Sequence, residues 1–241
     1  MVGKVLEGRL ALVTGASRGI GYQAALGFAQ AGAHVIAVAR TVGGLEELDD
    51  EIAEAGGSAT LVPLDITDFD ALDRLGASIH ERWGKLDILL GNAGTLGVLT
   101  PLPQNKPSVF EEVFAINVTA NYRLIRAMDP LLQASDAGRA LFLTSGAARS
   151  PKAFVGPYSA SKAALETLVI TYAAENRLTS VTANLVDPGT LRTKMRAQYA
   201  PGENPQSVTD PAEIVPSLVD LASPKSSQNG ATYHYPTKEG V

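Results

Sequence analysis

The stretch LALVTGASRGIG, residues 10–21, joins a short apolar run to a glycine-rich turn, and it decides the class of fold. Its first five residues predict a buried β-strand, and a helix is expected over 19–31. Gly15 permits a sharp turn, whereas Gly19 and Gly21 let the backbone approach a pyrophosphate at the helix N-terminus. The spacing is G-x-x-x-G-x-G, which differs from the G-x-G-x-x-G dinucleotide fingerprint, but its place between strand and helix favours the same role.

The alternation of apolar strand and amphipathic helix continues along the whole chain. Strands are predicted at 10–14, 34–39, 59–63, 86–90, 140–144 and 181–186, with 231–235 at the sheet edge, and helices at 19–31, 45–55, 68–82, within 107–132 and at 158–176. Apolar strands separated by helices require a parallel sheet covered on both faces, and right-handed crossovers make it doubly wound. We therefore expect one α/β domain over residues 1–241, a single-domain Rossmann-type doubly wound parallel sheet of about seven strands with helices on both faces.

The composition excludes several classes of function. The chain has 241 residues, no cysteine, three scattered histidines and a net charge of −5. Disulfides and thiolate metal sites are therefore excluded, no metal is expected, and scattered basic residues argue against binding to nucleic acid. Residues 1–9 lack the apolar run of a secretory signal, and no apolar run approaches the ~20 residues that cross a bilayer, so we expect a cytoplasmic protein without membrane contact.

Ligands of doubly wound sheets bind beyond the carboxyl ends of the strands, and polar motifs follow several predicted strands here. The second strand ends at Arg40 without the acid that would accept a hydrogen bond from the ribose 2′-hydroxyl of NAD. Arg18 and Arg40 instead suit a 2′-phosphate, which favours NADP(H) over NAD(H), unless both are solvated surface residues. Asp65 is a candidate acceptor for the adenine amino group, and residues 92–94 (NAG) offer compact backbone to the adenosine ribose, although both patterns also occur in ordinary turns.

The segment YSASK, residues 158–162, contains the candidate catalytic residues. Tyr158 and Lys162 lie four residues apart on one predicted helix and therefore share a face. A phenol has a reference pKa near 10, and a neighbouring ammonium lowers the pKa of a phenol. Tyr158 is therefore a candidate proton donor and acceptor. Alone, such a pair also occurs on helix surfaces.

Together these motifs resemble the short-chain dehydrogenase/reductase family. The chain carries, in the family's order, TGASRGIG, NAG, the asparagine of FAINVTANY, the serine of LFLTSGA, YSASK and the PG of DPGTLRT, and the resemblance covers about residues 8–235. Two departures are Gly91, where a doubled asparagine is usual, and Asp187 before the proline. Residues 195–214 further resemble one bacterial subgroup of the family.

The resemblance implies roles for individual residues. Tyr158 matches the catalytic acid/base and Lys162 its partner, which also holds the nicotinamide ribose. Ser145 matches the serine that hydrogen-bonds the substrate oxygen, and Asn117 the asparagine that stabilises a water in the proton relay. The candidate cofactor contacts are Gly15, Ser17, Arg18, Gly19, Ile20, Gly21, Arg40, Asp65, Ile66, Asn92, Ala93, Gly94, Tyr158, Lys162, Pro188, Gly189, Thr190 and Thr193.

The expected function is NADP(H)-dependent hydride transfer to or from a small carbonyl or alcohol substrate. An NAD-dependent alcohol dehydrogenase, a 3-oxoacyl-carrier-protein reductase and a non-catalytic dinucleotide-binding sensor or scaffold remain alternatives. A mostly apolar substrate pocket is expected from Thr95, Leu96, Ala147, Phe154, Val155, Met195 and Tyr199. Residues 190–211, rich in Pro, Gly, Asn and Gln, predict a substrate lid or else a plain surface excursion.

Relatives in the family commonly pair through the helices that follow strands four and five. In this chain those are the helices predicted within 107–132 and at 158–176. The resemblance therefore implies a homodimer or homotetramer.

Overall fold

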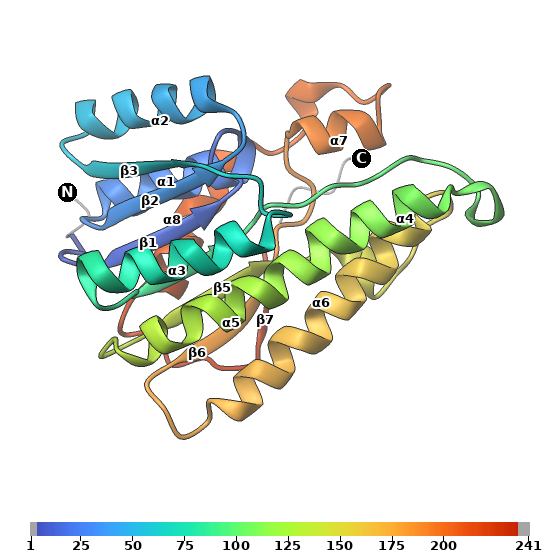
Figure 1. Ribbon diagram of the computed structural model, residues 1–241. Helices are drawn as coiled ribbons and strands as arrows, with labels where there is room; N and C mark the ends of the chain where they lie inside the picture. The colour runs from blue at the N-terminus through green and yellow to red at the C-terminus, as the bar shows by residue number, and fades with distance from the viewer. Residues whose placement is uncertain (1–3, 236–241) are drawn as a thin grey trace.

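A computed structural model describes residues 4–235 and contains one seven-stranded sheet in which every pairing is parallel (Figure 1). The strands are β1 (Leu10–Thr14), β2 (His34–Ala39), β3 (Ser58–Pro63), β4 (Ile88–Gly91), β5 (Arg139–Leu143), β6 (Thr182–Asp187) and β7 (Thr232–His234). Their order is β3-β2-β1-β4-β5-β6-β7, so the chain reverses direction across the sheet between β1 and β4. The predicted fold class is confirmed, and residues 1–3 and 236–241 of the predicted domain lie outside the described residues.

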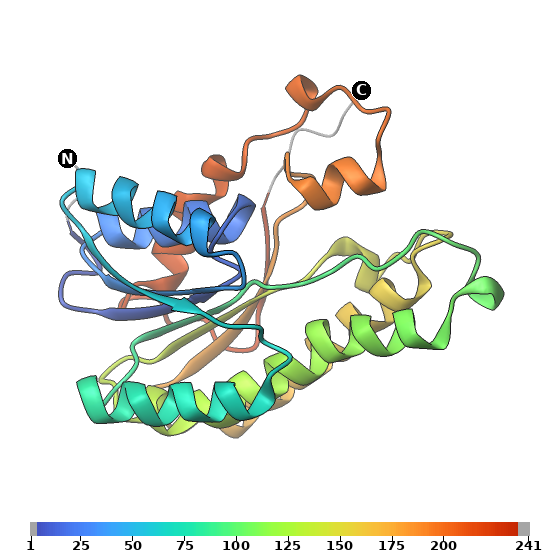
Figure 2. The ribbon, with the colours of Figure 1, turned by 45° about the horizontal axis from the view of Figure 1, so that its top comes forward.

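Helices cover both faces of the sheet (Figures 1 and 2). On one face α1 (Gly19–Gln30), α2 (Val42–Glu54) and α8 (Val215–Ala222) pack around the large side chains of Phe28, Leu48 and Leu218. On the other face α3 (Phe69–Trp83), α5 (Ala120–Gln133) and α6 (Gly156–Glu175) bury Leu72, Met128 and Val169. The strand residues divide between these two cores by alternation, since successive side chains point to opposite faces of a sheet.

The helices differ from the prediction within residues 107–133, at α7 (Lys194–Tyr199), which was not predicted as a helix, and at α8. The helix expected within 107–132 is instead α4 (Pro107–Phe114), a π-helical turn (Ala115–Thr119) and α5. The π turn widens the helix where Asn117 becomes fully buried, and such turns occur preferentially at functional sites. α8 has no counterpart among the predicted helices, because its eight residues are too few to display a clear helical period.

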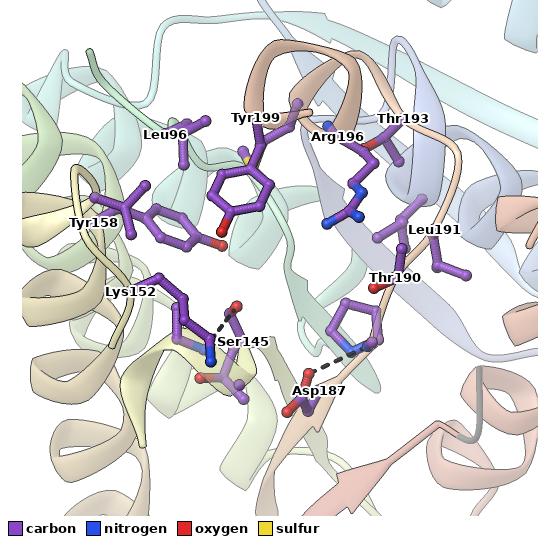
Figure 3. Close-up of a pocket in the computed structure, with 18 of the residues that line it drawn as sticks. Leu96, Ser145, Lys152, Tyr158, Asp187, Thr190, Leu191, Thr193, Arg196 and Tyr199 are labelled. Carbon is purple, nitrogen blue, oxygen red and sulfur yellow. Dashed lines mark hydrogen bonds between the residues drawn. The ribbon is translucent and has the colours of Figure 1, made fainter. Parts of the chain in front are cut away.

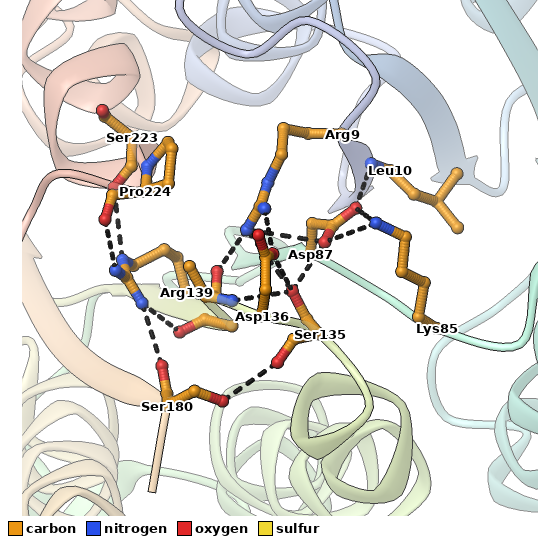
Figure 4. A network of polar contacts seen from close by, with 12 residues as sticks. Arg9, Leu10, Lys85, Asp87, Ser135, Asp136, Arg139, Ser180, Ser223 and Pro224 are labelled. Carbon is orange, nitrogen blue, oxygen red and sulfur yellow. Dashed lines mark hydrogen bonds and ion pairs between the residues drawn. The ribbon is translucent and has the colours of Figure 1, made fainter.

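A polar network closes the amino edge of the sheet, at the opposite end of the strands from the glycine-rich loop (Figure 4). Asp87 is fully buried just before β4, accepts hydrogen bonds from the Leu10 backbone (2.8 Å) and Ser135 (2.6 Å), and pairs with Arg9 (3.4 Å). Arg139 donates to four backbone carbonyls, those of Gly138, Ser180, Ser223 and Pro224. The network satisfies buried polar groups that would otherwise be costly, so its role is in stability.

Candidate active site

The glycine-rich loop links the carboxyl end of β1 to α1. Gly15 (φ 68°) and Gly19 (φ 59°) adopt left-handed backbone that favours glycine. Gly21 has a role different from the predicted one: it is buried behind the loop, and a Cβ there would lie 2.4 Å from both the Asn92 side chain and the Gly15 carbonyl. Gly21 therefore allows close packing of helix, loop and β4, while Gly15 and Gly19 line a cavity at this edge of the sheet.

Thr14 and Asn92 lock this loop to the end of β4. The Thr14 hydroxyl accepts hydrogen bonds from the backbone of Asn92 (3.0 Å) and Ala93 (3.1 Å). The Asn92 side chain donates to the carbonyls of Thr14 (2.8 Å) and Gly15 (3.3 Å). Thr14 is fully buried and was missed by the sequence analysis, although its place between strand and first glycine is the signal that would have identified it.

Arg40 and Asp65 stand together at the rim of the loop. Their side chains form an ion pair of 3.5 Å, with 67% and 42% of the respective side chains exposed. Partial burial tends to raise the pKa of Asp65, but hydrogen bonds from Thr67 and the charge of Arg40 outweigh it and lower that pKa. Asp65 therefore stays ionised and holds Arg40 at the rim.

A cavity of about 460 Å³ runs from this rim to the centre of the carboxyl edge. Predicted cofactor contacts that line it are Gly15, Ser17, Arg18, Gly19, Ile20, Arg40, Asp65, Ile66, Asn92, Ala93, Gly94, Tyr158, Lys162, Pro188 and Thr193. Gly189 and Thr190 line the neighbouring cavity. The fold thus gathers residues from six strand ends around one elongated space.

Ser145, Tyr158 and Lys162 meet where the two cavities join. Ser145 follows β5, and its Oγ accepts a hydrogen bond from the Ala147 backbone (3.2 Å). Tyr158 and Lys162 lie one turn apart in α6, both buried, with the ammonium 5.9 Å from the centre of the phenol ring. The Lys162 ammonium donates to the Leu143 carbonyl (2.8 Å), which anchors α6 to the end of β5.

The electrostatics of this group differ from the expectation. Burial raises the pKa of Tyr158, hydrogen bonding by Ser145 works against that rise, and Asp187 adds to it. The expected lowering by Lys162 is therefore wrong for the protein without ligand, because the loss of hydration dominates. Burial also lowers the pKa of Lys162 to about 8, partly opposed by Glu166. At neutral pH the site holds a neutral phenol beside an ammonium.

Asn117 sits in the π turn and joins three elements. Its Oδ1 accepts from the Thr95 backbone (2.8 Å), and its Nδ2 donates to the Thr95 carbonyl (2.9 Å) and to Ser161 (2.9 Å). Ser161 in turn donates to the Tyr158 carbonyl (2.7 Å). The amide thus ties the loop after β4 to the helix that carries the tyrosine and the lysine.

Asn121, one helical turn after Asn117, contacts a candidate site residue from behind and was missed by the sequence analysis. It is buried, and its Nδ2 donates to the Asn117 carbonyl (2.8 Å). Its Oδ1 lies 2.7 Å from where a Cβ of Gly91 would stand, with the Phe142 ring at 2.4 Å. Asn121 and Phe142 therefore fill the space that a side chain at position 91 would occupy. Gly91, one of the two departures from the family pattern in the sequence, is the feature from which Asn121 could have been identified.

The neighbouring cavity, of about 580 Å³, opens beside Ser145 and Tyr158 (Figure 3). Leu96, Ala147, Val155, Met195 and Tyr199 line it as expected. Thr95 belongs to the first cavity instead. The prediction for Phe154 is wrong: this residue adopts φ 71°, is 56% exposed and does not line either cavity.

Neither a metal centre nor a membrane span is found among residues 4–235. No cluster of three or more His, Cys, Asp or Glu side chains could hold a metal ion there. In the same part of the chain, every helix is too short or too polar to traverse a bilayer.

Fold and site together define an α/β protein of the dinucleotide-binding class, with a serine, a tyrosine and a lysine where its two cavities join. The family model described as short chain dehydrogenase matches residues 9–204, so the chain belongs to the short-chain dehydrogenase family of oxidoreductases. It is similar to the uncharacterized oxidoreductase YciK of Escherichia coli K12, with 37% identity over 95% of this chain and 92% of that protein. The bacterial subgroup expected from residues 195–214 is thus the YciK-like one.

Solved structures agree with this assignment. A short-chain dehydrogenase from Shigella flexneri complexed with NADP matches with a TM-score of 0.92 and 36% identity, covering 96% of this chain and 98% of that one. A second, from Escherichia coli CFT073 complexed with NADPH, matches with a TM-score of 0.90 and 35% identity over 96% and 98% of the two chains. The chain is also 31% identical to the 3-oxoacyl-carrier-protein reductase FabG of Vibrio harveyi, over 95% of this chain and 96% of that protein.

Proposed function

We propose that this oxidoreductase transfers a hydride between NADP(H) and a small carbonyl or alcohol substrate, with Tyr158 as the acid/base. The observation that carries the proposal is the meeting of two cavities at Tyr158. One cavity is lined by the glycine loop, Arg40 and Lys162, and the other by Ser145 and apolar side chains. A cofactor and a substrate bound in the two spaces would therefore meet at the hydroxyl groups.

The residues present fit NADP(H). Backbone at Ser17, Gly19 and Ile20, at the N-terminus of α1, suits a pyrophosphate, and Arg18 and Arg40 lie where a 2′-phosphate would reach them. Lys162 would hold the nicotinamide ribose, and residues 188–193 the carboxamide. The similar structures complexed with NADP and NADPH support the same choice. When bound, NADPH supplies a hydride and NADP⁺ accepts one.

The chain's own residues supply the proton and stabilise developing charge. The hydroxyls of Ser145 and Tyr158 would donate hydrogen bonds to the substrate oxygen, where negative charge grows during reduction. Because burial raises the pKa of Tyr158, the phenol keeps its proton at neutral pH and is present in the acid form that carbonyl reduction requires. Lys162 stays cationic below about pH 8, which stabilises the phenolate left behind. Asn117 positions the helix that carries both residues.

Residues 190–211 are proposed as a lid over the substrate cavity. They contain the short helix α7 (Lys194–Tyr199), whose residues Met195, Arg196 and Tyr199 line that cavity. Gln198 donates to the Gly97 carbonyl (2.9 Å), a contact between the segment and the loop after β4. We also propose a homodimer or homotetramer formed through α4 and α5, the helices expected within 107–132, and through α6, by analogy with the family.

The test is turnover by Tyr158→Phe. Oxidation of NADPH is followed against a panel of aldehydes and ketones, and NADPH binding is titrated in parallel. We expect turnover to fall by a factor of at least about 10² while the Kd for NADPH is retained, since proton transfer by a positioned side chain contributes about 10²–10⁴. Near wild-type turnover would refute the assignment of Tyr158. A wild-type chain that binds NADPH but reduces no carbonyl would favour a non-catalytic sensor or scaffold.

A further inference from the structure

The substrate cavity contains three charged side chains, Lys152, Asp187 and Arg196 (Figure 3). They lie among apolar groups that include Leu96, Val155 and Met195. A charge in such surroundings is stable only when it is hydrated or paired. A charged side chain of the cavity that has no partner in the protein therefore indicates the charge of the ligand that would bind there.

Asp187 is compensated within the protein. Its Oδ2 is paired with the Arg149 guanidinium and lies 3.4 Å from His234, and its Oδ1 accepts from the Gly189 backbone (3.2 Å). Only 11% of the side chain is exposed. The carboxylate thus braces the 187–189 turn and has little capacity left for a ligand.

Arg196 is compensated as well. Its guanidinium makes two hydrogen bonds to the Glu203 carboxylate, each 2.6 Å, in the bidentate geometry that these two groups prefer. The guanidinium also lies 5.4 Å from the centre of the Tyr199 ring. These contacts stay inside the segment 190–211 and pair the charge of Arg196 with that of Glu203.

Lys152 is different, because it forms no ion pair with any of residues 4–235. It is an exposed side chain at the rim of the cavity that holds Ser145 and Tyr158. Among the charged side chains that line this cavity, Lys152 is the one without an oppositely charged partner in the part of the chain that the structure describes. It leaves the substrate cavity with one uncompensated positive charge.

The loop that carries Lys152 is held in a strained form. Phe154 has φ 71°, a left-handed conformation that costs a non-glycine residue of order 1–3 kcal/mol. Tertiary contacts hold it: the Thr100 backbone donates to the Phe154 carbonyl (3.1 Å), and buried Val155 packs with Leu96 and Tyr158. Strain of this kind persists where surrounding structure requires it, and it concentrates at ligand sites. The shape of the loop therefore belongs to the cavity.

We propose that the substrate is an apolar carbonyl compound bearing a carboxylate, an oxo acid or the matching hydroxy acid, and that Lys152 binds the carboxylate. The carbonyl would face Ser145 and Tyr158, and the apolar body would lie against Leu96 and Val155. A singly charged carboxylate fits better than a doubly charged phosphate, because Lys152 supplies one positive charge and that of Arg196 is already paired with Glu203. This inference rests on the proposed function and names its substrate class.

The test compares each oxo acid of a chain-length series with its neutral methyl ester. For the wild type we expect kcat/KM to favour the best acid over its ester by about tenfold, as for one charge-assisted contact in partly exposed surroundings. Lys152→Met should bring the ratio near one, and Lys152→Glu should reverse it. Lys225→Met, an exposed lysine at the opposite edge of the sheet, should leave the ratio unchanged. Raising the salt concentration should reduce the ratio in the wild type and leave it unchanged in Lys152→Met.

A binding measurement separates this inference from the proposed function. Calorimetry of the NADP⁺-loaded enzyme compares a medium-chain alkanoic acid with the primary amide of the same length, neither of which can react. We expect tighter binding of the acid in the wild type and equal binding in Lys152→Met. Equal binding in the wild type, or an acid preference that survives Lys152→Met, would overturn the carboxylate site even if esters and acids are both reduced. Acid preference without any turnover would keep the site and refute the proposed function.

Discussion

Replacing Arg40 by alanine tests the preference for NADP(H) directly. A hydrogen bond to a charged group contributes about 1.5–3 kcal/mol, which sets the gross value of a contact with the 2′-phosphate. The Arg40 side chain is 67% exposed and pairs with Asp65 at 3.5 Å in the protein without ligand. Giving up this surface ion pair to contact the phosphate costs up to about 1 kcal/mol. The net loss is therefore about 1–2 kcal/mol, or a 5- to 30-fold rise in the Kd for NADPH.

The assay is fluorescence titration with NADPH and NADH in parallel at two salt concentrations. Arg40→Ala should leave the Kd for NADH unchanged, because NADH lacks the phosphate. Arg40→Asp should go further and favour NADH, since a carboxylate at the end of the second strand can accept from the ribose 2′-hydroxyl. Arg82→Ala is the matched control, because Arg82 is also exposed and makes a single cation–π contact, with Trp83.

Two results would refute this reasoning. If Arg40→Ala raises the Kd values for NADPH and NADH equally, Arg40 does not contact the 2′-phosphate, and its effect is on the shape of the cavity rim. If the wild type binds NADH more tightly than NADPH, the choice of cofactor is wrong while the family assignment remains.

Three further predictions concern the relay and the edge of the sheet. Lys162→Met should stop turnover yet stabilise the fold by about 1–2 kcal/mol at pH 7 in chemical denaturation. Burial lowers the pKa of this lysine to about 8, worth roughly 3 kcal/mol, less one lost hydrogen bond. This gain in stability should shrink as pH rises from 8, where Lys162 of the folded protein loses its proton, to about 10.5, where Lys162 of the unfolded chain does so. A gain in stability that does not change with pH would show that the pKa of Lys162 is not lowered by folding. Asn121→Leu should lower kcat roughly tenfold with little change in KM, because it removes the hydrogen bond to the Asn117 carbonyl. The control Asn176→Leu removes a similar hydrogen bond, to the Tyr172 carbonyl of α6, and should change only stability. Equal kcat values in the two variants would contradict a positioning role for Asn121. Asp87→Ala should destabilise the fold by about 3 kcal/mol in urea but leave the Kd for NADPH unchanged, and a weakened Kd would mean that the two edges of the sheet are coupled.

Local pattern in the sequence was enough to predict most of the fold. Strand residues such as those of β1 and β5 form short apolar runs, and the helices between them show polar and apolar faces, so the parallel sheet and its seventh edge strand could be expected. The π turn at Asn117 could not be expected. A helix gains one residue there because the Asn117 amide has partners at Thr95 and Ser161, which are 22 and 44 residues away in the chain.

Some features of the candidate site could likewise be predicted from the sequence, whereas others depend on tertiary contacts. The order and spacing of the motifs determined the family, the cofactor cleft and the set of Ser145, Tyr158 and Lys162, because spacing along one helix or after one strand is a local property. Only the tertiary structure decided that Gly21 packs against Asn92, that Phe154 is exposed and lines neither cavity, and that the pKa of Tyr158 is raised. Burial and the pairing of charges depend on which distant segments pack together, and a linear pattern does not carry that information.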